Sequence, residues 1–211
     1  LYSSAASDVY KRQICIGRSK KLMFTPSSQT TEVASFLGKK SLDLGIELKF
    51  VDTIGLDGRP SFFCENASLA KRTFQSLGLD LSTKDQARVI DCNIWPGRFE
   101  WALKSPPVLL DGAHNPQAAR ALAESLKMES LKWNIVIGTG SGHDAKAILS
   151  ELASVSTQFL ITTSDHPKAE RPEKIALGIP ENVSFEVIED WKDAFSRGVK
   201  LSNEENTALC I

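Results

Sequence analysis

The first part of the chain carries apolar side chains at helical spacing. Residues 31–44 show this period and end at a glycine, which predicts an amphipathic helix with a C-terminal glycine stop. Residues 46–50 alternate between apolar and charged side chains and predict a half-buried strand. Two further helices are predicted over residues 67–77 and 82–90, the second with a serine as its N-cap. Residues 1–13 show no such period, and we expect them to be disordered or not native to the protein.

Apolar runs and amphipathic segments alternate regularly in the rest of the chain. The two parts meet at residues 93–98, NIWPGR, where proline and glycine interrupt the helical period and predict a domain boundary. Beyond it, short apolar runs separated by helices of about ten residues predict a mostly parallel, doubly wound α/β sheet, which binds ligands beyond the carboxyl ends of its strands. The predicted strands cover residues 99–103, 108–111, 133–137, 159–162, 184–188 and 207–211, and the predicted helices cover residues 116–127, 144–154, 172–177 and 191–200.

The composition excludes several classes of protein. The chain has 211 residues, of which 42% are hydrophobic and 24% charged, so it is neither disordered nor of low complexity. Its net charge of -1 provides no basic field for a nucleic acid, and no apolar run is long enough for a membrane span. The 4 cysteines are far apart, which argues against a disulfide framework or a zinc ribbon and favours a reducing compartment. We therefore expect neither nucleic acid nor membrane among its partners.

Residues 108–116, VLLDGAHNP, predict a buried strand, a tight loop and the start of a helix. Asn115 is a favourable N-cap, and Pro116 suits the first helical position because that position needs no N–H donor. Asp111 and His114 would then lie at the mouth of the sheet, beside the positive end of a helix dipole. A carboxylate there can accept a ribose hydroxyl, and the helix end favours phosphate oxygens. The segment indicates a nucleotide site; the alternative is a turn aspartate with an inert loop histidine.

Other polar and aromatic segments have simpler explanations. Residues 138–142, GTGSG, lack the lysine and spacing of a phosphate-binding loop and predict a flexible connection between a strand and a helix. His143 and His166 are expected to be loop residues, since no carboxylate cluster accompanies them and we predict no metal site. We expect Trp95 to pack at the domain boundary. The tryptophans expected in the core or an interface are Trp101, Trp133 and Trp191.

The segments WPGRFE (95–100) and LDGAHNP (110–116) resemble motifs of the folylpolyglutamate synthase/dihydrofolate synthase family, relatives of the Mur peptide ligases. In that family a (W/L)PGR motif opens the C-terminal domain, and a D(G/V)AHNP motif follows at the spacing found here, with Arg98 13 positions before Asp111. The segment ENASLA (65–70) also resembles the start of a helix in the family. The two motifs together are specific, whereas either alone would be weak.

The resemblance implies a P-loop ATPase domain joined to a C-terminal Rossmann-like domain, both α/β. Residues 14–92 would be the C-terminal part of the ATPase domain, and residues 93–211 would be the Rossmann-like domain, truncated at its end. The P-loop, the magnesium ligands and most of the folate-binding surface would then lie upstream. We accordingly expect the chain to be an internal fragment without ligase activity of its own.

The resemblance also implies an activity, ATP-dependent addition of glutamate to dihydropteroate or to folate polyglutamates through an acyl phosphate. Carried over by motif, Asn66 contacts the adenine end of the nucleotide, Arg98 its phosphates and Asp111 its ribose, while His114 is the catalytic residue beside it. Each role has a structural alternative: Asn66 as an N-cap, Arg98 in a surface ion pair and His114 bonded to a backbone carbonyl. The implied cofactors are ATP and Mg2+, and the implied partners are ATP, L-glutamate and a pteroate or folate. We expect a monomer in the cytoplasm, or in an organelle of a eukaryote.

Two other functions fit the same pattern. A Mur-type ligase acting on a cell-wall precursor shares the architecture, although its motif usually differs from DGAHNP. A Rossmann-like module that binds a nucleotide without catalysing a reaction is the other alternative. A substrate panel separates the first from a folate ligase, and an upstream phosphate loop separates both ligases from the second.

Overall fold

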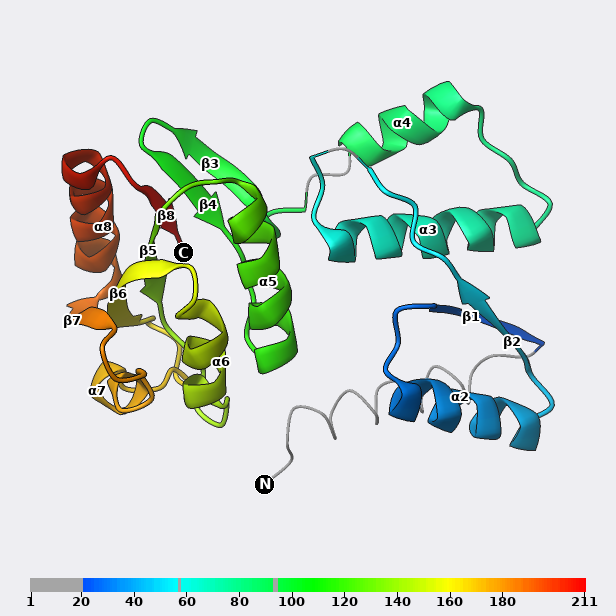
Figure 1. The fold of residues 1–211 in the computed structure, drawn as a ribbon, viewed down its shortest axis with the longest axis horizontal. Coiled ribbons are helices and arrows are strands. Elements are labelled where there is room, and N and C mark those ends of the chain that lie inside the picture. The colour runs from blue at the N-terminus through cyan, green and yellow to red at the C-terminus, as the bar shows by residue number, and fades with distance from the viewer. Residues whose placement is uncertain (1–20, 57, 93–94) are drawn as a thin grey trace. The chain divides into compact units, whose positions relative to one another are not determined.

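A computed structural model describes residues 21–56, 58–92 and 95–211 of the chain (Figure 1). The chain divides into two compact units, Leu1–Asn93 and Ile94–Ile211. The second unit holds the PGR and DGAHNP motifs and is a six-stranded α/β domain. The first holds the remaining motif residue, Asn66, within a smaller set of helices and strands.

The sheet of the second unit is mostly parallel, as predicted. Its strand order is β3-β4-β8-β5-β6-β7, and only β3 runs antiparallel to its neighbour. The pairing of β4 with β8 and of β8 with β5 means that the last strand of the chain returns to the middle of the sheet. The strands are β3 (Glu100–Lys104), β4 (Pro107–Leu110), β5 (Trp133–Ile137), β6 (Ser156–Thr163), β7 (Ser184–Asp190) and β8 (Ala208–Cys210).

Helices cover both faces of this sheet. Figure 1 shows α5 and α6 on one side of the strands and α8 on the other. Successive strand residues alternate between two hydrophobic clusters, because side chains along a strand point to opposite faces: Leu109 packs with α5, α6 and α7, whereas Val108 packs with α8. This two-sided burial explains the continuous apolar runs of the sequence. The helices are α5 (Pro116–Met128), α6 (Ala145–Leu152), α7 (Pro172–Ala176) and α8 (Trp191–Glu205).

Helix α5 begins as its sequence predicted. The Asn115 side chain accepts a hydrogen bond from the Ala118 N–H at 2.9 Å, and Pro116 occupies the first turn. The predicted inward face is buried; its residues are Ala119, Leu122, Ala123 and Leu126. The cap therefore fixes the point at which the chain leaves β4 and turns back over the sheet.

Asn115→Ala should lower the free energy of unfolding of the second unit by about 1 kcal/mol, because the Ala118 N–H loses its partner. Urea unfolding followed by tryptophan fluorescence measures this, since all 4 tryptophans lie in that unit. Gln117→Ala, an exposed change in the same turn, is the control and should be neutral. Equal midpoints for both variants would contradict the capping role.

The first unit differs from prediction at two places. Strand β1 (Leu22–Pro26), which was not predicted, pairs in parallel with β2 (Glu47–Val51). Helix α3 (Ser61–Ser76) begins six residues before its predicted start at Ala67, because Phe62, Phe63 and Cys64 extend the helix towards the N-terminus. Helices α2 (Thr31–Asp43) and α4 (Thr83–Cys92) lie where expected, and the Asp85 N–H donates to Ser82 Oγ at 3.2 Å.

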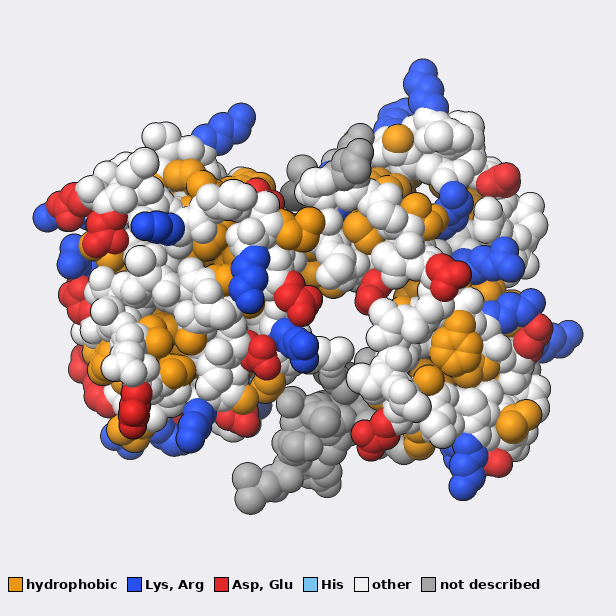
Figure 2. All heavy atoms as spheres, in the orientation of Figure 1, with side chains coloured by type: hydrophobic (Ala, Val, Ile, Leu, Met, Phe, Trp, Pro, Cys, Tyr) orange, Lys and Arg blue, Asp and Glu red, His pale blue; other side chains and the backbone are white. Residues whose placement is uncertain are grey.

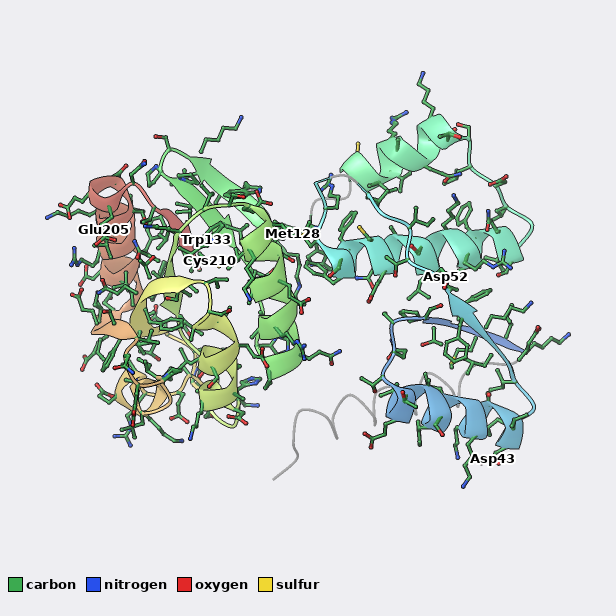
Figure 3. All side chains as sticks on the ribbon, viewed as in Figure 1. Asp43, Asp52, Met128, Trp133, Glu205 and Cys210 are labelled. Atoms are coloured by element: carbon green, nitrogen blue, oxygen red, sulfur yellow. The ribbon has the colours of Figure 1, made fainter. Side chains whose placement is uncertain are left out.

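The tryptophans follow the prediction only in part. Trp133 is fully buried, and Figure 3 labels it among the side chains of the second unit. Trp101 and Trp191 are each 43% exposed, so neither belongs to the core of the unit. Trp95, which was expected to pack at the domain boundary, is 69% exposed. Trp101 instead lies against the ring of Trp133, with 5.9 Å between ring centroids. Among the described residues, no helix is long and apolar enough to cross a membrane.

Candidate functional site

The PGR motif forms a tight turn that enters the second unit. The Arg98 N–H donates to the Trp95 carbonyl at 3.1 Å, and the Gly97 N–H donates to the Glu100 carboxylate at 2.7 Å. Gly97 and Phe99 both have left-handed backbones, with φ of 67° and 48°. Glycine adopts this conformation freely, whereas a phenylalanine does so only where its surroundings hold it. The turn is therefore a fixed support for the side chain at its tip, Arg98.

Asp111 joins this turn to the end of β4. One carboxylate oxygen accepts from the Phe99 N–H and the other from the Ala113 N–H, each at 2.9 Å. These bonds hold Phe99 in its left-handed conformation and close the loop that leads to α5. Each oxygen keeps a second lone pair, so the carboxylate can still accept a hydroxyl from a ligand. The aspartate therefore stabilises the turn and the loop through its hydrogen bonds, and the same carboxylate can also bind a ligand.

Arg98 lies at the same strand end as Asp111. A Cβ atom built on Gly112 would lie 2.7 Å from Arg98 Nη1 and 3.4 Å from Arg98 Cζ, so the guanidinium rests against the backbone between β4 and α5. The Gly112 N–H donates to the Gly97 carbonyl at 2.8 Å and ties the two segments together. Arg98 is otherwise exposed. The structure therefore brings together the guanidinium and the carboxylate that the motifs predicted as neighbours.

Burial raises the pKa of Asp111 above its ordinary value. Its two backbone hydrogen bonds and the charges of Arg98 and His114 lower that pKa, but desolvation is the larger effect. Cys210, on the adjacent strand β8, has a raised pKa because it is buried and because the Asp111 charge is near. The thiol is accordingly held neutral beside the site, and Figure 3 labels it within the second unit.

His114 is held by the loop in which it lies. Its Nδ1 is 2.8 Å from the Gly112 carbonyl oxygen, so Nδ1 carries the proton and Nε2 faces away from that bond. This is the backbone contact considered above as its structural alternative. The His114 ring also meets His143 edge to face, with 5.6 Å between centroids. The contact joins the loop after β4 to the loop after β5, a neighbour that the sequence did not indicate.

The GTGSG segment is a strand-to-helix loop, as predicted, and main-chain bonds hold it. The Ser141 N–H donates to the Lys168 carbonyl at 2.6 Å, and the Glu170 N–H donates to the Thr139 carbonyl at 2.8 Å. Gly140 lies against the His143 ring, with 3.0 Å from a built Cβ to the nearest ring atom. Loops after β4, β5 and β6 thus meet at the carboxyl edge of the sheet, where such folds bind ligands.

Asn66 lies in the other unit, exposed in the middle of α3. Because α3 begins at Ser61, Asn66 is not an N-cap, and that alternative is wrong. The structure brings Arg98, Asp111 and His114 together in the second unit. The described residues contain no group of three or more histidine, cysteine, aspartate or glutamate side chains that could hold a metal ion. On the face shown in Figure 2, basic and acidic side chains are intermixed over both units.

The second unit is a Rossmann-like α/β domain with a carboxylate, a guanidinium and a helix start at the carboxyl edge of its mostly parallel sheet, which is where such folds bind ligands. The family described as "Mur ligase, glutamate ligase domain" matches residues 97–211. The chain therefore belongs to the Mur ligase family. This match includes the whole DGAHNP motif and the Gly97–Arg98 part of the PGR motif. Together with the folate-type relative described next, it confirms the resemblance.

Two curated relatives represent two branches of this family. The dihydrofolate synthase/folylpolyglutamate synthase of Escherichia coli is 28% identical over 69% of the chain and 34% of its own length. The UDP-N-acetylmuramoyl-L-alanyl-D-glutamate–2,6-diaminopimelate ligase of Caldanaerobacter subterraneus is 33% identical over 49% of the chain and 23% of its own length. The chain thus spans at most about a third of the length of these two relatives. The folate-type relative matches the larger part of it.

A solved structure supports the fold over both units. The folylpolyglutamate synthase of Mycobacterium tuberculosis complexed with ADP has a TM-score of 0.79 and 20% sequence identity. The match covers 89% of this chain and 51% of that one. At this identity the likeness establishes the fold alone, and the predicted α/β class is confirmed.

Proposed function

We propose that the chain belongs to an ATP-dependent amide ligase that adds glutamate to dihydropteroate or to folate polyglutamates. The observation that carries the proposal is the meeting of Arg98, Asp111 and His114 at the end of β4 in a Mur ligase domain. The M. tuberculosis folylpolyglutamate synthase of the same fold binds ADP. The nucleotide is accordingly the ligand that we assign to this edge of the sheet.

The residues suit the parts of a nucleotide in different ways. The Asp111 carboxylate has one lone pair free on each oxygen and can accept ribose hydroxyls. The Arg98 guanidinium, a planar fork of donors, can bind phosphate oxygens in pairs. His114 has Nε2 available to orient the nucleotide or its phosphates, since Nδ1 is engaged with Gly112. The assignment of Asn66 to the adenine end stays a prediction from the family resemblance, since this residue lies in the first unit.

The chemistry requires ATP because a carboxylate is a poor electrophile. Transfer of the γ-phosphoryl group to the substrate carboxylate gives an acyl phosphate and ADP. The amine of glutamate then attacks the acyl carbon, the bond to the phosphate oxygen breaks, and an amide and inorganic phosphate are released. Positioning and neutralisation of charge supply most of the catalysis in such a transfer. Arg98 would contribute positive charge at the nucleotide phosphates. Mg2+ would be held by residues outside this unit and would also neutralise phosphate charge.

A folate-type substrate is favoured over a cell-wall precursor by the extent of the match. The folate-type relative aligns with 69% of the chain and the diaminopimelate ligase with 49%. The WPGR and DGAHNP motifs point in the same direction. The cell-wall reaction is the second candidate, since its relative has the higher identity over the shorter match.

A substrate panel with the gene product at its natural length tests the proposal. ATP is combined with dihydropteroate and glutamate, with tetrahydrofolate and glutamate, or with UDP-N-acetylmuramoyl-L-alanyl-D-glutamate and diaminopimelate. Product mass and ADP release are measured in each arm. We expect an amide product in one or both folate arms. Product in the third arm alone assigns the cell-wall reaction, and ADP binding without product in any arm identifies a non-catalytic nucleotide-binding protein.

A further inference from the structure

His143 has no role in the function proposed above, but its ring meets the histidine of the candidate site. The rings of His114 and His143 contact each other edge to face, with 5.6 Å between centroids and 80° between ring planes. Aromatic rings favour this arrangement, because the positive edge of one ring faces the negative face of the other. The chain has 3 histidines, and two of them therefore meet at the carboxyl edge of the sheet.

The loop that carries His143 is held on both sides of this residue. Before it, the Ser141 N–H donates to the Lys168 carbonyl at 2.6 Å. After it, the Asp144 side chain accepts from the Ala147 N–H at 3.0 Å and caps helix α6. The His143 ring is therefore presented from a backbone that hydrogen bonds hold in place.

The His143 ring also lies against Gly140. A Cβ built on Gly140 would lie 3.0 Å from Cδ2 and 3.3 Å from Nε2 of His143. Gly140 itself forms an antiparallel bridge with Ala169, in the loop after β6. The main chain of its own loop thus supports the His143 ring, which contacts the His114 ring of the loop after β4.

The His114 ring needs such a contact. Its side chain is exposed, and its Nδ1 lies 2.8 Å from the Gly112 carbonyl oxygen. One hydrogen bond fixes one ring atom, but the ring can still tilt about that bond. A packing contact at another part of the ring restricts the tilt, as the side chains of a binding site require. The His143 ring supplies this contact from a different loop.

We propose that His143 is the positioning residue for His114, because its ring holds the His114 imidazole at the angle at which Nδ1 stays bonded to Gly112 and Nε2 stays available to a ligand. The inference rests on the proposed function, in which Nε2 of His114 orients the nucleotide or its phosphates. His143 acts on the nucleotide through the His114 ring and makes no bond to the nucleotide itself.

The test compares His143→Ala with His143→Phe, with ADP as the probe. We expect His143→Ala to weaken ADP binding roughly 2- to 10-fold, as for the loss of one aromatic pair. His143→Phe keeps an aromatic ring without ring nitrogens, so it should bind ADP within about twofold of wild type. His166→Ala removes the third, exposed histidine and is the control, which should bind as wild type. If His143→Phe binds as weakly as His143→Ala, the ring nitrogens of His143 are required and the positioning role is wrong.

A double-mutant cycle with His114→Ala examines how the effect reaches the nucleotide. We expect His114→Ala to weaken ADP binding roughly 10- to 100-fold, as for the loss of a hydrogen bond to a charged group. The double variant should bind ADP no more weakly than His114→Ala alone, since His143 acts only through that ring. Fully additive losses would mean that each histidine contacts the nucleotide separately, and they overturn the positioning role.

A readout without nucleotide separates the inference from the proposed function. The 15N shifts of a neutral imidazole report which ring nitrogen carries the proton, and in wild type the His114 proton should lie on Nδ1. His143→Ala should give a mixture of both tautomers, because a tilted ring loses its bond to Gly112. His143→Phe and His166→Ala should keep the wild-type tautomer.

An unchanged His114 tautomer in His143→Ala overturns the positioning role. If His114→Ala binds ADP as wild type does but the tautomer changes in His143→Ala, the role of His114 in the proposed function fails and the positioning role stands.

Discussion

Asp111→Ala is expected to destabilise the second unit and to weaken its binding of nucleotide. The change removes both acceptors that the Phe99 and Ala113 N–H groups use. An unsatisfied buried N–H costs about 1–3 kcal/mol, and this half-buried position admits some water, so we expect a loss of about 1–3 kcal/mol for the pair. Chemical unfolding followed by tryptophan fluorescence measures the loss.

The nucleotide effect has a separate cause, the loss of the carboxylate that would accept the ribose hydroxyls. We expect ADP binding to fall roughly 10- to 100-fold under conditions in which the variant is still folded. Asp111→Asn is the matched variant: it keeps one acceptor oxygen and turns an amide toward the other N–H. It should therefore fall between wild type and Asp111→Ala in both measurements. If a folded Asp111→Ala protein binds ADP with the affinity of wild type, Asp111 does not contact the nucleotide and its role is structural only.

The pH dependence of stability gives an independent check on this carboxylate. Since burial raises its pKa in the folded protein, the folded state binds a proton more tightly than the unfolded state does. Asp111 then contributes most to stability below its unfolded pKa, and the contribution falls as the pH rises through the folded value. Wild type should therefore gain stability relative to Asp111→Asn as the pH is lowered from 7 towards 4. A relative loss over that range would show that the hydrogen bonds and cations outweigh desolvation.

The elements that the sequence predicted best are those in which one local signal sufficed. VLLDGAHNP contains an apolar run, a cap residue and a proline in the order that a strand, loop and helix require, and β4 and α5 follow it closely. The start of α3 was missed because Pro60 and the aromatic residues after it give no polar cap signal. Strand β1 was missed because LMFTP is short and ends at a proline, and its parallel partner is distant in sequence.

The contacts that define the candidate site could be predicted less well. The proximity of Arg98 and Asp111 followed from their motifs. The hydrogen bonds from backbone N–H groups to both Asp111 oxygens depend on the left-handed conformation of Phe99, which the conformational preference of phenylalanine does not predict. The His114–His143 contact depends on the order of the strands, since β5 lies two positions from β4 in the sheet. Such contacts depend on the tertiary arrangement of the strands and loops, which cannot be predicted from the local pattern of a single sequence.

The second large effect is expected at the opposite end of the sheet, in Trp133→Ala. Trp133 opens β5, is fully buried, and donates from Nε1 to the Leu126 carbonyl at 3.2 Å. Removing a buried aromatic side chain costs about 3–5 kcal/mol, and the Leu126 carbonyl loses a donor in addition. Trp133→Phe should cost less, because it keeps a ring in the cavity and loses only the N–H and part of the volume. Differential scanning calorimetry measures both changes without relying on the removed fluorophore.

Trp101→Ala is the matched control, because this ring packs on Trp133 from the solvent side and is 43% exposed. Its loss should cost clearly less than that of Trp133, since less apolar surface leaves contact with the protein. Trp133 lies at the amino end of β5, whereas Asp111 follows the carboxyl end of the parallel strand β4. Folded Trp133→Phe protein should therefore bind ADP as wild type does, although it unfolds more readily. A loss of ADP affinity in that variant would show that the core and the candidate site are coupled through the sheet.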